Sequence, residues 1–293
     1  MIVAGAGNDR IRGLGGNDVI CGGEGADAIQ GGPGNDRLFG ELDLLRIDDF
    51  GRVVKKGDTV SGGEGDDSID LGRDVRPATE GTRTFADGIS YVDAPAAVVV
   101  DFQSASTVPI AADGNDTVTG FDHGIRVFGS PLGDTIKGTN SDDTLSGTVG
   151  IDTFVGGSGE DVLASTSESH QMFRGGGGVD TVSFPIPVES GFVAKGYGGQ
   201  DKLRLLPTSN PSLKPTLRID QQNGKITIRD LLPVTLEGSI NGFSDIVLPA
   251  RTLTIFKGSN ESEVITAHPD YRVLLYGRGG ADTCRATEKR SSC

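Results

Sequence analysis

The chain has 293 residues, a formal net charge of −14 and 35% hydrophobic residues, with no tryptophan. The acidic balance argues against binding to nucleic acid or to anionic membranes, and no apolar run approaches the length that spans a membrane. Its 46 glycines make up about 16% of the chain, against a usual share of about 7%, but they lack the three-residue period of collagen. This composition favours a repetitive fold in which each layer buries few side chains.

Residues 4–39 consist of four nine-residue units in one phase. Each unit has glycine at its fourth place, an aliphatic residue at its eighth and aspartate at its sixth, namely Asp9, Asp18, Asp27 and Asp36. Glycine supplies the positive φ values of a tight turn over the first six places, and the last three form a short strand whose middle side chain points inward. Two successive units then make one coil. We therefore predict an all-β fold, a parallel β-roll or β-solenoid of nonapeptide repeats (18-residue coils) with irregular coils or insertions.

Stacking of such coils places Asp9 over Asp27 on one edge and Asp18 over Asp36 on the other. At the strand spacing of about 4.8 Å, two carboxylates repel by about 3–4 kcal/mol at the effective dielectric of a protein surface. A ladder of such pairs needs cations between its rungs. Calcium takes roughly six to eight oxygens in flexible geometry, whereas magnesium needs a smaller and stricter octahedron. The pattern therefore predicts several calcium ions, and a nonapeptide of this composition is typical of calcium-binding parallel β-helices.

The repeat is interrupted over residues 46–110. One complete unit, 62–70, carries Asp67, and Asp58 with Val60 forms half of another. Because no aspartate with a glycine frame lies one full coil away from Asp67 in either direction, we expect Asp67 to be a weak or partial site. The apolar run 97–102 is predicted to be a core strand.

A second block of units covers residues 111–204, and its sixth-place aspartates are Asp116, Asp134, Asp143, Asp152, Asp161, Asp180 and Asp201. The 18-residue rule puts Asp116, Asp134 and Asp152 on one edge. The other edge begins at Asp143 and continues through Asp161, Asp180 and Asp201. The first edge is expected to lapse after Ala164, with His170 in the aspartate place as its terminator.

Residues 205–257 contain prolines that argue against helix and strand-like runs at 217–219, 225–228, 246–248 and 253–256. We interpret them as irregular coils of the same solenoid. The nine-residue frame returns at 258–266 with Glu263, and at 277–285 with Asp282. The predicted organisation is a first repeat block, an irregular segment, a second repeat block, irregular β coils and terminal repeats with a cysteine-bounded tail, at 1–45, 46–110, 111–204, 205–257 and 258–293.

The units at 4–39, 62–70, 129–164, 175–183, 196–204 and 277–285 resemble the repeats-in-toxin (RTX) family, also called hemolysin-type calcium-binding repeats. The resemblance implies a parallel β-roll, an extracellular location, and calcium held between adjacent turns by sixth-place aspartates and turn carbonyls. The positions carried over are Asp9, Asp18, Asp27, Asp36, Asp67, Asp116, Asp134, Asp143, Asp152, Asp161, Asp180, Asp201 and Asp282. The short basic tail at 284–293 looks more like stand-alone repeat proteins exported through the general pathway than like members with an apolar or acidic C-terminal signal.

No His-Glu-x-x-His, Gly-x-Ser-x-Gly or Cys-x-x-Cys motif is present. We therefore expect a secreted or cell-surface calcium-binding protein without catalysis, whose folding depends on extracellular calcium and whose protein or polysaccharide partner is unknown. One alternative is the C-terminal repeat module of a larger toxin or hydrolase, since Ile2 fits the inward place of a unit whose turn would precede the chain.

A second, less favoured alternative is a polysaccharide-active β-helix with its acids and bases around Arg218, Asp220 and Lys225. Cys284 and Cys293 are close enough in sequence to pair, and the sequence leaves both a disulfide and a reduced tail open.

Overall fold

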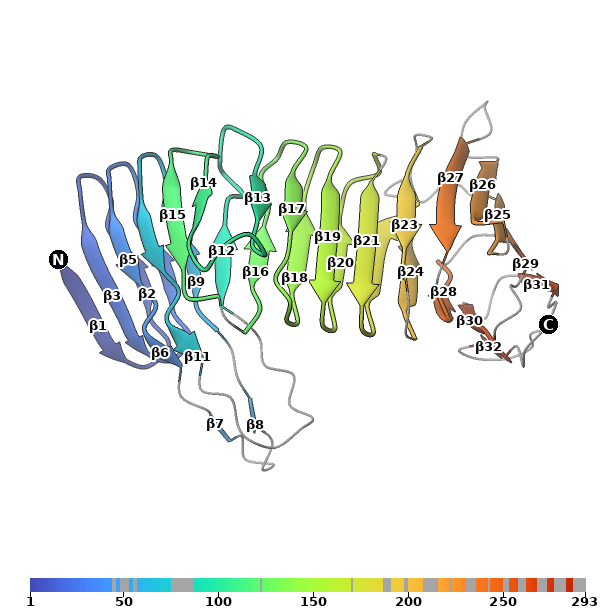
Figure 1. The fold of residues 1–293 in the computed structure, drawn as a ribbon, viewed down its shortest axis with the longest axis horizontal. Helices are drawn as coiled ribbons and strands as arrows, with labels where there is room; N and C mark the ends of the chain where they lie inside the picture. The colour runs from blue at the N-terminus through green and yellow to red at the C-terminus, as the bar shows by residue number, and fades with distance from the viewer. Residues whose placement is uncertain are drawn as a thin grey trace. The chain divides into compact units, whose positions relative to one another are not determined.

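The computed structural model describes residues 1–43, 46–47, 53–54, 57–74, 87–121, 123–169, 171–186, 191–197, 200–207, 216–221, 223–229, 236–241, 243–249, 253–257, 262–267, 273–276 and 283–286. Within these residues the chain forms short strands and no helix (Figure 1), which confirms the all-β prediction. It follows that no helix of the described part is a candidate membrane span. The chain divides into two compact units, Met1–Thr148 and Val149–Cys293.

In the first unit, parallel strands lie in two long rows. One row contains β1 (Ile2–Ala6), β3 (Val19–Glu24), β5 (Arg37–Phe39), β10 (Ser68–Asp70), β15 (Asp116–Thr119) and β14 (Val108–Ile110), of which β14 alone runs antiparallel. The other contains β2 (Arg10–Arg12), β4 (Ala28–Gln30), β9 (Thr59–Ser61), β12 (Gly88–Ser90), β16 (Arg126–Phe128) and β18 (Thr144–Gly147). A further parallel pair joins β13 (Val99–Asp101), within the predicted run 97–102, to β17 (Thr135–Lys137).

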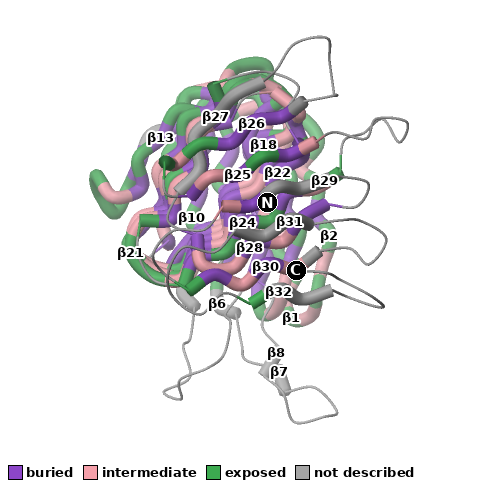
Figure 2. Tube along the Cα trace, turned by 90° about the vertical axis from the view of Figure 1, so that its right-hand side faces the viewer, coloured by how far each residue is buried: buried purple, intermediate pink, exposed green. Residues whose placement is uncertain are grey.

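The strand register aligns the eighth-place aliphatic residues of successive units. Ile20 pairs with Ile2 on one side and with Leu38 on the other, and Ile11 pairs with Ile29. Of these, Ile20 and Leu38 are fully buried. The eighth-place aliphatic residues of both rows of strands therefore form the core of this unit, and Figure 2 marks the buried segments along the trace. The coil predicted for residues 4–39 is confirmed.

Beyond residue 39 the coils keep this register but change in length. Ile69 pairs with both Leu38 and Val118, and Ile89 pairs with both Val60 and Val127. The longer connections carry two small strand pairs, β6 (Leu42–Asp43) with β11 (Arg73–Asp74), and β7 (Arg46–Ile47) with β8 (Val53–Val54). The coils of this region are longer than two units, in keeping with the predicted irregular coils or insertions, because loops lengthen at little entropic cost while the strands stay in register.

The second unit also has two rows. One contains β20 (Val162–Ser165), β22 (Thr181–Pro185), β24 (Lys202–Leu206), β28 (Asp245–Val247), β30 (Val264–Ala267) and β32 (Thr283–Ala286), all parallel where paired. The other contains β19 (Thr153–Ser158), β21 (Met172–Gly177), β23 (Val193–Lys195), β27 (Leu236–Asn241), β26 (Lys225–Arg229), β25 (Thr216–Asp220), β29 (Leu253–Lys257) and β31 (Val273–Tyr276). The four strand-like runs predicted in 205–257 fall in or at β25, β26, β28 and β29.

Two features of the second unit differ from the simple repeat. The β25–β26–β27 segment is antiparallel, so the interpretation of 205–257 as coils alone is incomplete. Four aromatic side chains, Phe154, Phe173, Phe184 and Phe192, pack in the core, with neighbouring ring centroids 5.5–6.0 Å apart. Cys293 lies outside the described residues, so the question of a Cys284–Cys293 bond stays open.

Candidate metal centre

The sixth-place aspartates point into the roll. The sixth and eighth places are two residues apart in the strand direction, so their side chains share the inward face. Asp36 is 1% exposed and Asp180 is fully buried. A buried carboxylate needs compensation from donors or cations, because transfer of the charge out of water is costly.

One carboxylate oxygen of each aspartate stabilises the stack of coils. Oδ1 accepts a hydrogen bond from the backbone N–H that occupies the sixth place of the preceding coil. The donor–acceptor pairs are Asp9–Asp27, Asp18–Asp36, Asp27–Asp58, Asp36–Asp67, Asp58–Asp87, Asp67–Asp116, Asp161–Asp180 and Asp180–Asp201, at 2.7–3.0 Å. Each aspartate therefore joins two coils before any ion is considered.

The second oxygen has no such partner at several of these residues. Oδ2 of Asp27, Asp36, Asp67 and Asp180 is buried and accepts no hydrogen bond from the described residues. In each case it lies against the first-place glycine of its own turn. A Cβ added at Gly62 would lie 2.1 Å from Oδ2 of Asp67, and one at Gly175 would lie 2.2 Å from Oδ2 of Asp180. Glycine is thus required at this place if the carboxylate is to enter the turn.

Burial without a compensating charge shifts the ionisation of these groups. Burial raises the pKa of Asp67 from 3.8 to about 6, against the lowering effect of the Asp36 N–H and with help from the charge of Asp116. Burial likewise raises the pKa of Asp180 to about 6, and it raises the pKa of Asp27. A bound cation would supply the missing compensation and hold the carboxylates ionised.

Carboxylates alone do not form a complete ligand set. Among the described residues, no group of three or more His, Cys, Asp or Glu side chains is placed to hold a metal. Backbone carbonyls of the glycine turns lie beside these carboxylates and are oxygen donors of the kind that calcium accepts. Gly23 and Gly25, with φ of 110° and 124°, pack so closely on the preceding coil that a Cβ would lie 1.9 Å from Gly5 O and 2.1 Å from Gly7 O, respectively.

In one of the described coils an amide takes the place of the carboxylate. Gln171 Oε1 accepts the backbone N–H of Asp152 at 2.9 Å, as an aspartate Oδ1 does elsewhere. Its Nε2 donates to the carbonyl of Gly150 at 2.9 Å. At this coil the amide N–H of the sixth-place side chain itself reaches a turn carbonyl. A cation between an aspartate Oδ2 and a turn carbonyl would do the same elsewhere, so the residues present fit calcium.

The model of the RTX calcium-binding nonapeptide repeat matches the chain four times, over residues 1–29, 22–43, 56–74 and 128–164. The chain therefore carries RTX nonapeptide repeats in these segments. No curated protein matches it. Among solved structures it is similar to the extracellular lipase LipA from Serratia marcescens, with 17% identity and a TM-score of 0.24, over 78% of this chain and 37% of the lipase.

The RTX stacks differ from the predicted ones at Asp67 and Asp87. Asp67 is fully inside a stack, because Asp36 donates to it across 31 residues and it donates to Asp116 across 49. The weak or partial site expected at Asp67 rested on the absence of a partner one coil away, and the structure supplies a partner on each side. Asp87 joins the other stack through the Asp58 N–H, 29 residues away, and the sequence analysis missed it. Its signal is the Asp-x-aliphatic triplet 87–89 without a glycine frame.

Two further expectations need correction. Asp134 Oδ1 accepts the N–H of Val98, 36 residues earlier, and not that of Asp116, two units earlier. Gln171, rather than His170, occupies the aspartate place opposite Asp152, and His170 itself lies outside the described residues. Oδ2 of Asp116 accepts a hydrogen bond from the hydroxyl of the buried Tyr91 at 3.0 Å.

The later RTX repeats follow the prediction where they are described. Asp161, Asp180 and Asp201 form one stack with spacings of 19 and 21 residues. Glu263 is 1% exposed, and Asp282 lies outside the described residues. Of the residues considered for polysaccharide chemistry, Asp220 pairs with Lys257 at 2.7 Å. Despite some burial, Lys257 and Asn223 hold the pKa of Asp220 below its ordinary value.

Proposed function

We propose that this RTX protein is a non-catalytic, secreted or surface-exposed β-roll whose folding is coupled to the binding of several extracellular calcium ions. The observation that carries the proposal is the second carboxylate oxygen of Asp27, Asp36, Asp67 and Asp180, which is buried and accepts no hydrogen bond from the described residues. These oxygens recur at the same place of successive repeats, so one type of ion repeated along the roll accounts for all of them.

The coupling follows from the cost of burying carboxylates. In the unfolded chain water solvates every aspartate, whereas the folded coil holds Asp67 and Asp180 at 3% and 0% exposure. Without an ion, this burial opposes folding at neutral pH. When a metal site exists only in the folded state, the free energy of metal binding adds to the free energy of folding.

An extracellular location suits this chemistry. Calcium sites of extracellular modules have dissociation constants of about 10⁻⁴–10⁻³ M, which free calcium in the cytosol does not saturate. The chain would therefore remain unfolded where calcium is scarce and become rigid after export. The net charge of −14 also keeps the unfolded chain extended and soluble.

The test is a calcium titration of chelator-treated full-length protein, followed by far-UV circular dichroism and repeated with magnesium. We expect a cooperative gain of β signal with calcium and little gain with magnesium. Calorimetry on the same samples counts the ions. A chelated protein with its full β signal and no calcium uptake contradicts the proposal. An activity screen on acidic polysaccharides tests the absence of catalysis, with no turnover expected.

A further inference from the structure

The second place of the nine-residue unit is occupied by glycine in some repeats and by a hydroxyl residue in others, beside further types such as Leu14 and Tyr197. It is glycine with a positive φ at Gly23, Gly32, Gly63 and Gly176. In the units 129–137 and 138–146 it is Ser130 and Thr139, and neither has a positive φ. We call the first kind glycine turns and the second kind hydroxyl turns. The two kinds treat the sixth-place aspartate differently.

In the hydroxyl turn at 138–146, the turn itself satisfies the carboxylate. Thr139 donates its backbone N–H to Oδ2 of Asp143 at 2.6 Å and its hydroxyl to Oδ1 at 2.9 Å. Oδ1 also accepts the N–H of Ile125 from the preceding coil at 2.8 Å. Both oxygens of Asp143 therefore have donors, and charge-assisted bonds of this kind are about twice as strong as neutral ones.

The turn at 129–137 has part of this construction. The hydroxyl of Ser130 donates to Oδ1 of Asp134 at 2.7 Å. The hydroxyl oxygen in turn accepts the backbone N–H of Leu132 at 3.1 Å, just as Thr139 Oγ1 accepts the N–H of Ser141 at 3.0 Å. The fourth place needs no glycine here, because this local bond fixes the turn.

In glycine turns the corresponding backbone N–H points elsewhere. Gly32 N donates to Gly62 O of the next coil at 2.8 Å, and Gly176 N donates to Gly196 O at 3.1 Å. These amides are therefore not available to the aspartates of their own turns. The second-place backbone N–H, which bonds Oδ2 of Asp143 in the hydroxyl turn, is thus used for coil stacking in a glycine turn. Oδ2 of Asp36 and Asp180 is left without a hydrogen bond from the described residues.

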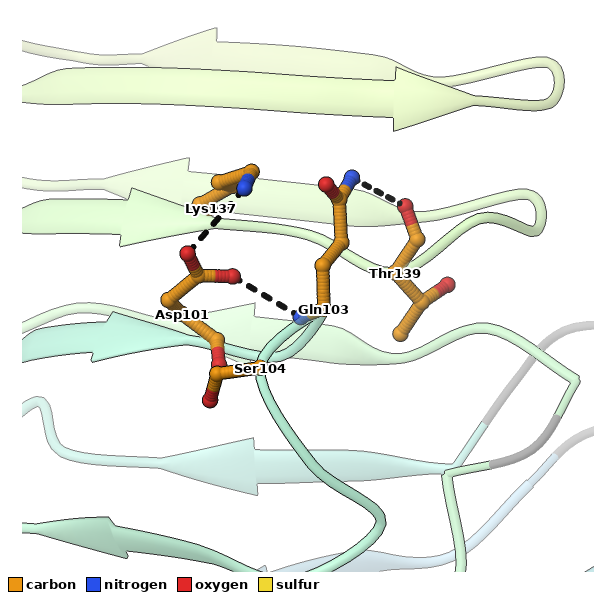
Figure 3. Close-up of polar contacts among 5 residues, drawn as sticks. All are labelled: Asp101, Gln103, Ser104, Lys137 and Thr139. Atoms are coloured by element: carbon orange, nitrogen blue, oxygen red, sulfur yellow. Dashed lines mark hydrogen bonds and ion pairs between the residues drawn. The ribbon is translucent and has the colours of Figure 1, made fainter.

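A neighbouring loop also occupies a carbonyl of the hydroxyl turn. Gln103 Nε2 donates to the carbonyl of Thr139 at 2.9 Å (Figure 3). Gln103 is positioned by its own N–H, which donates to Oδ1 of Asp101 at 2.9 Å, and Asp101 pairs with Lys137 at 3.0 Å. The turn carbonyl that an ion would use as a ligand thus already accepts a side-chain amide.

We propose that Thr139 takes the place of calcium in the repeat 138–146. Thr139 supplies donors to both oxygens of Asp143, so Asp143 is not a calcium ligand, whereas glycine leaves Asp36 and Asp180 to the ion. A second-place hydroxyl is not sufficient by itself: Val98 and Ser130 both donate to Oδ1 of Asp134, and Thr148 donates its hydroxyl to the carbonyl of Ser130. The roll then contains a metal-independent turn at 138–146 beside its calcium-binding turns. This inference rests on the proposed function, and it overrides the sequence prediction for Asp143.

The test compares ion counts of full-length variants by calorimetry in calcium. D143N is expected to bind as many ions as the wild type, whereas D67N and D180N bind fewer. Thr139→Val removes only the hydroxyl donor and keeps the backbone N–H to Oδ2 of Asp143, so this variant, for which an unchanged ion count is expected, remains informative if D143N folds poorly. Thermal denaturation adds a second readout. D143N lowers Tm equally with calcium and with chelator, whereas D180N lowers Tm only with calcium.

The outcomes separate the two proposals. Loss of an ion in folded D143N, with D67N and D180N also reduced, overturns the assignment of Asp143 and leaves the calcium function intact. A wild type without calcium uptake overturns the proposed function itself.

Discussion

The backbone N–H of Asp36 donates to Oδ1 of Asp67 at 2.8 Å, although 31 residues separate the two aspartates. This bond uses one oxygen of Asp67 for the stack and leaves Oδ2 buried without a hydrogen bond from the described residues. An asparagine would make the first interaction equally well, and only the second oxygen requires a carboxylate. The two oxygens therefore have separate roles, one in coil pairing and one in ion binding, and these roles can be separated by mutation.

Replacement of Asp67 by asparagine is expected to destabilise the protein in calcium and to stabilise it in chelator. In calcium, D67N loses a ligand and unfolds at a lower temperature than the wild type. In chelator, D67N is more stable by about 1–3 kcal/mol, because a buried and uncompensated charge is gone while Oδ1 remains. Gln171 indicates that an amide fits at this place. Denaturant unfolding with and without calcium measures both effects.

The matched control is Asp101→Asn. Asp101 is 46% exposed, pairs with Lys137 and takes no part in the stacks. Loss of an exposed ion pair costs about 0–1 kcal/mol, with or without calcium. If D67N behaves like D101N, Oδ2 of Asp67 is not a calcium ligand.

The calcium-free protein is expected to become more stable as pH falls from 7.5 to 5. The folded-state pKa values of Asp67 and Asp180 are raised to about 6 from 3.8. The native state therefore binds more protons than the unfolded state between these values, and the free energy of unfolding decreases as pH rises. The stabilisation is fully present below about 3.8 and is lost as pH rises through about 6. Denaturant unfolding in chelator at several pH values measures the slope.

Calcium binding should show the opposite dependence on pH. Protons and calcium compete for the same carboxylates, so affinity is expected to weaken as pH falls through about 6. Calorimetric titrations at pH 7.5 and 5.5 provide the check.

For the calcium-free protein, a loss of stability on acidification would show that groups other than Asp67 and Asp180 dominate the titration.

The sequence predicts the first four units well because sequence period and structural period coincide there. It fails at Asp67 and Asp87 because the phase rule counts residues, whereas the stack depends on strand register. Ile69 and Ile89 stay in register through connections of any length. An Asp-x-aliphatic triplet is the local signal that survives such connections, and it is too short to be recognised without the neighbouring coils.

The difference between glycine and hydroxyl turns is visible in the sequence, but its effect on the sixth-place aspartate cannot be inferred from the sequence alone. Ser130 and Thr139 simply look like imperfect matches to glycine. Only the structure shows that Thr139 turns its N–H and its hydroxyl onto Asp143. Residue spacing alone does not predict which donors of a turn converge on one carboxylate.

Alanine substitutions at three glycines should separate backbone strain from coil stacking. Gly5 and Gly23 both have a positive φ, near 105° and 110°, but a Cβ meets nothing within 4 Å at Gly5 and meets Gly5 O at 1.9 Å at Gly23. G5A is expected to cost about 1 kcal/mol from the backbone alone, and G23A is expected to cost clearly more. Gly15 has no positive φ and ordinary contacts, so G15A is the neutral control. Equal effects of G5A and G23A on Tm in calcium would contradict the close packing of the coils.

Replacement of Tyr91 by phenylalanine tests the donor that closes the Asp116 end of its stack. The Tyr91 hydroxyl donates to Oδ2 of Asp116 at 3.0 Å, and both residues are at most 1% exposed. Burial raises the pKa of Asp116 to about 7, and the hydroxyl opposes this rise. Y91F is therefore expected to lose about 1–3 kcal/mol at pH 8 and less at pH 5, where Asp116 is protonated. Because the donated hydrogen bond favours ionised Asp116, its loss should steepen the fall in stability from pH 5 to pH 8. A loss that is equal at both pH values would indicate that Tyr91 contributes through packing rather than through its hydroxyl.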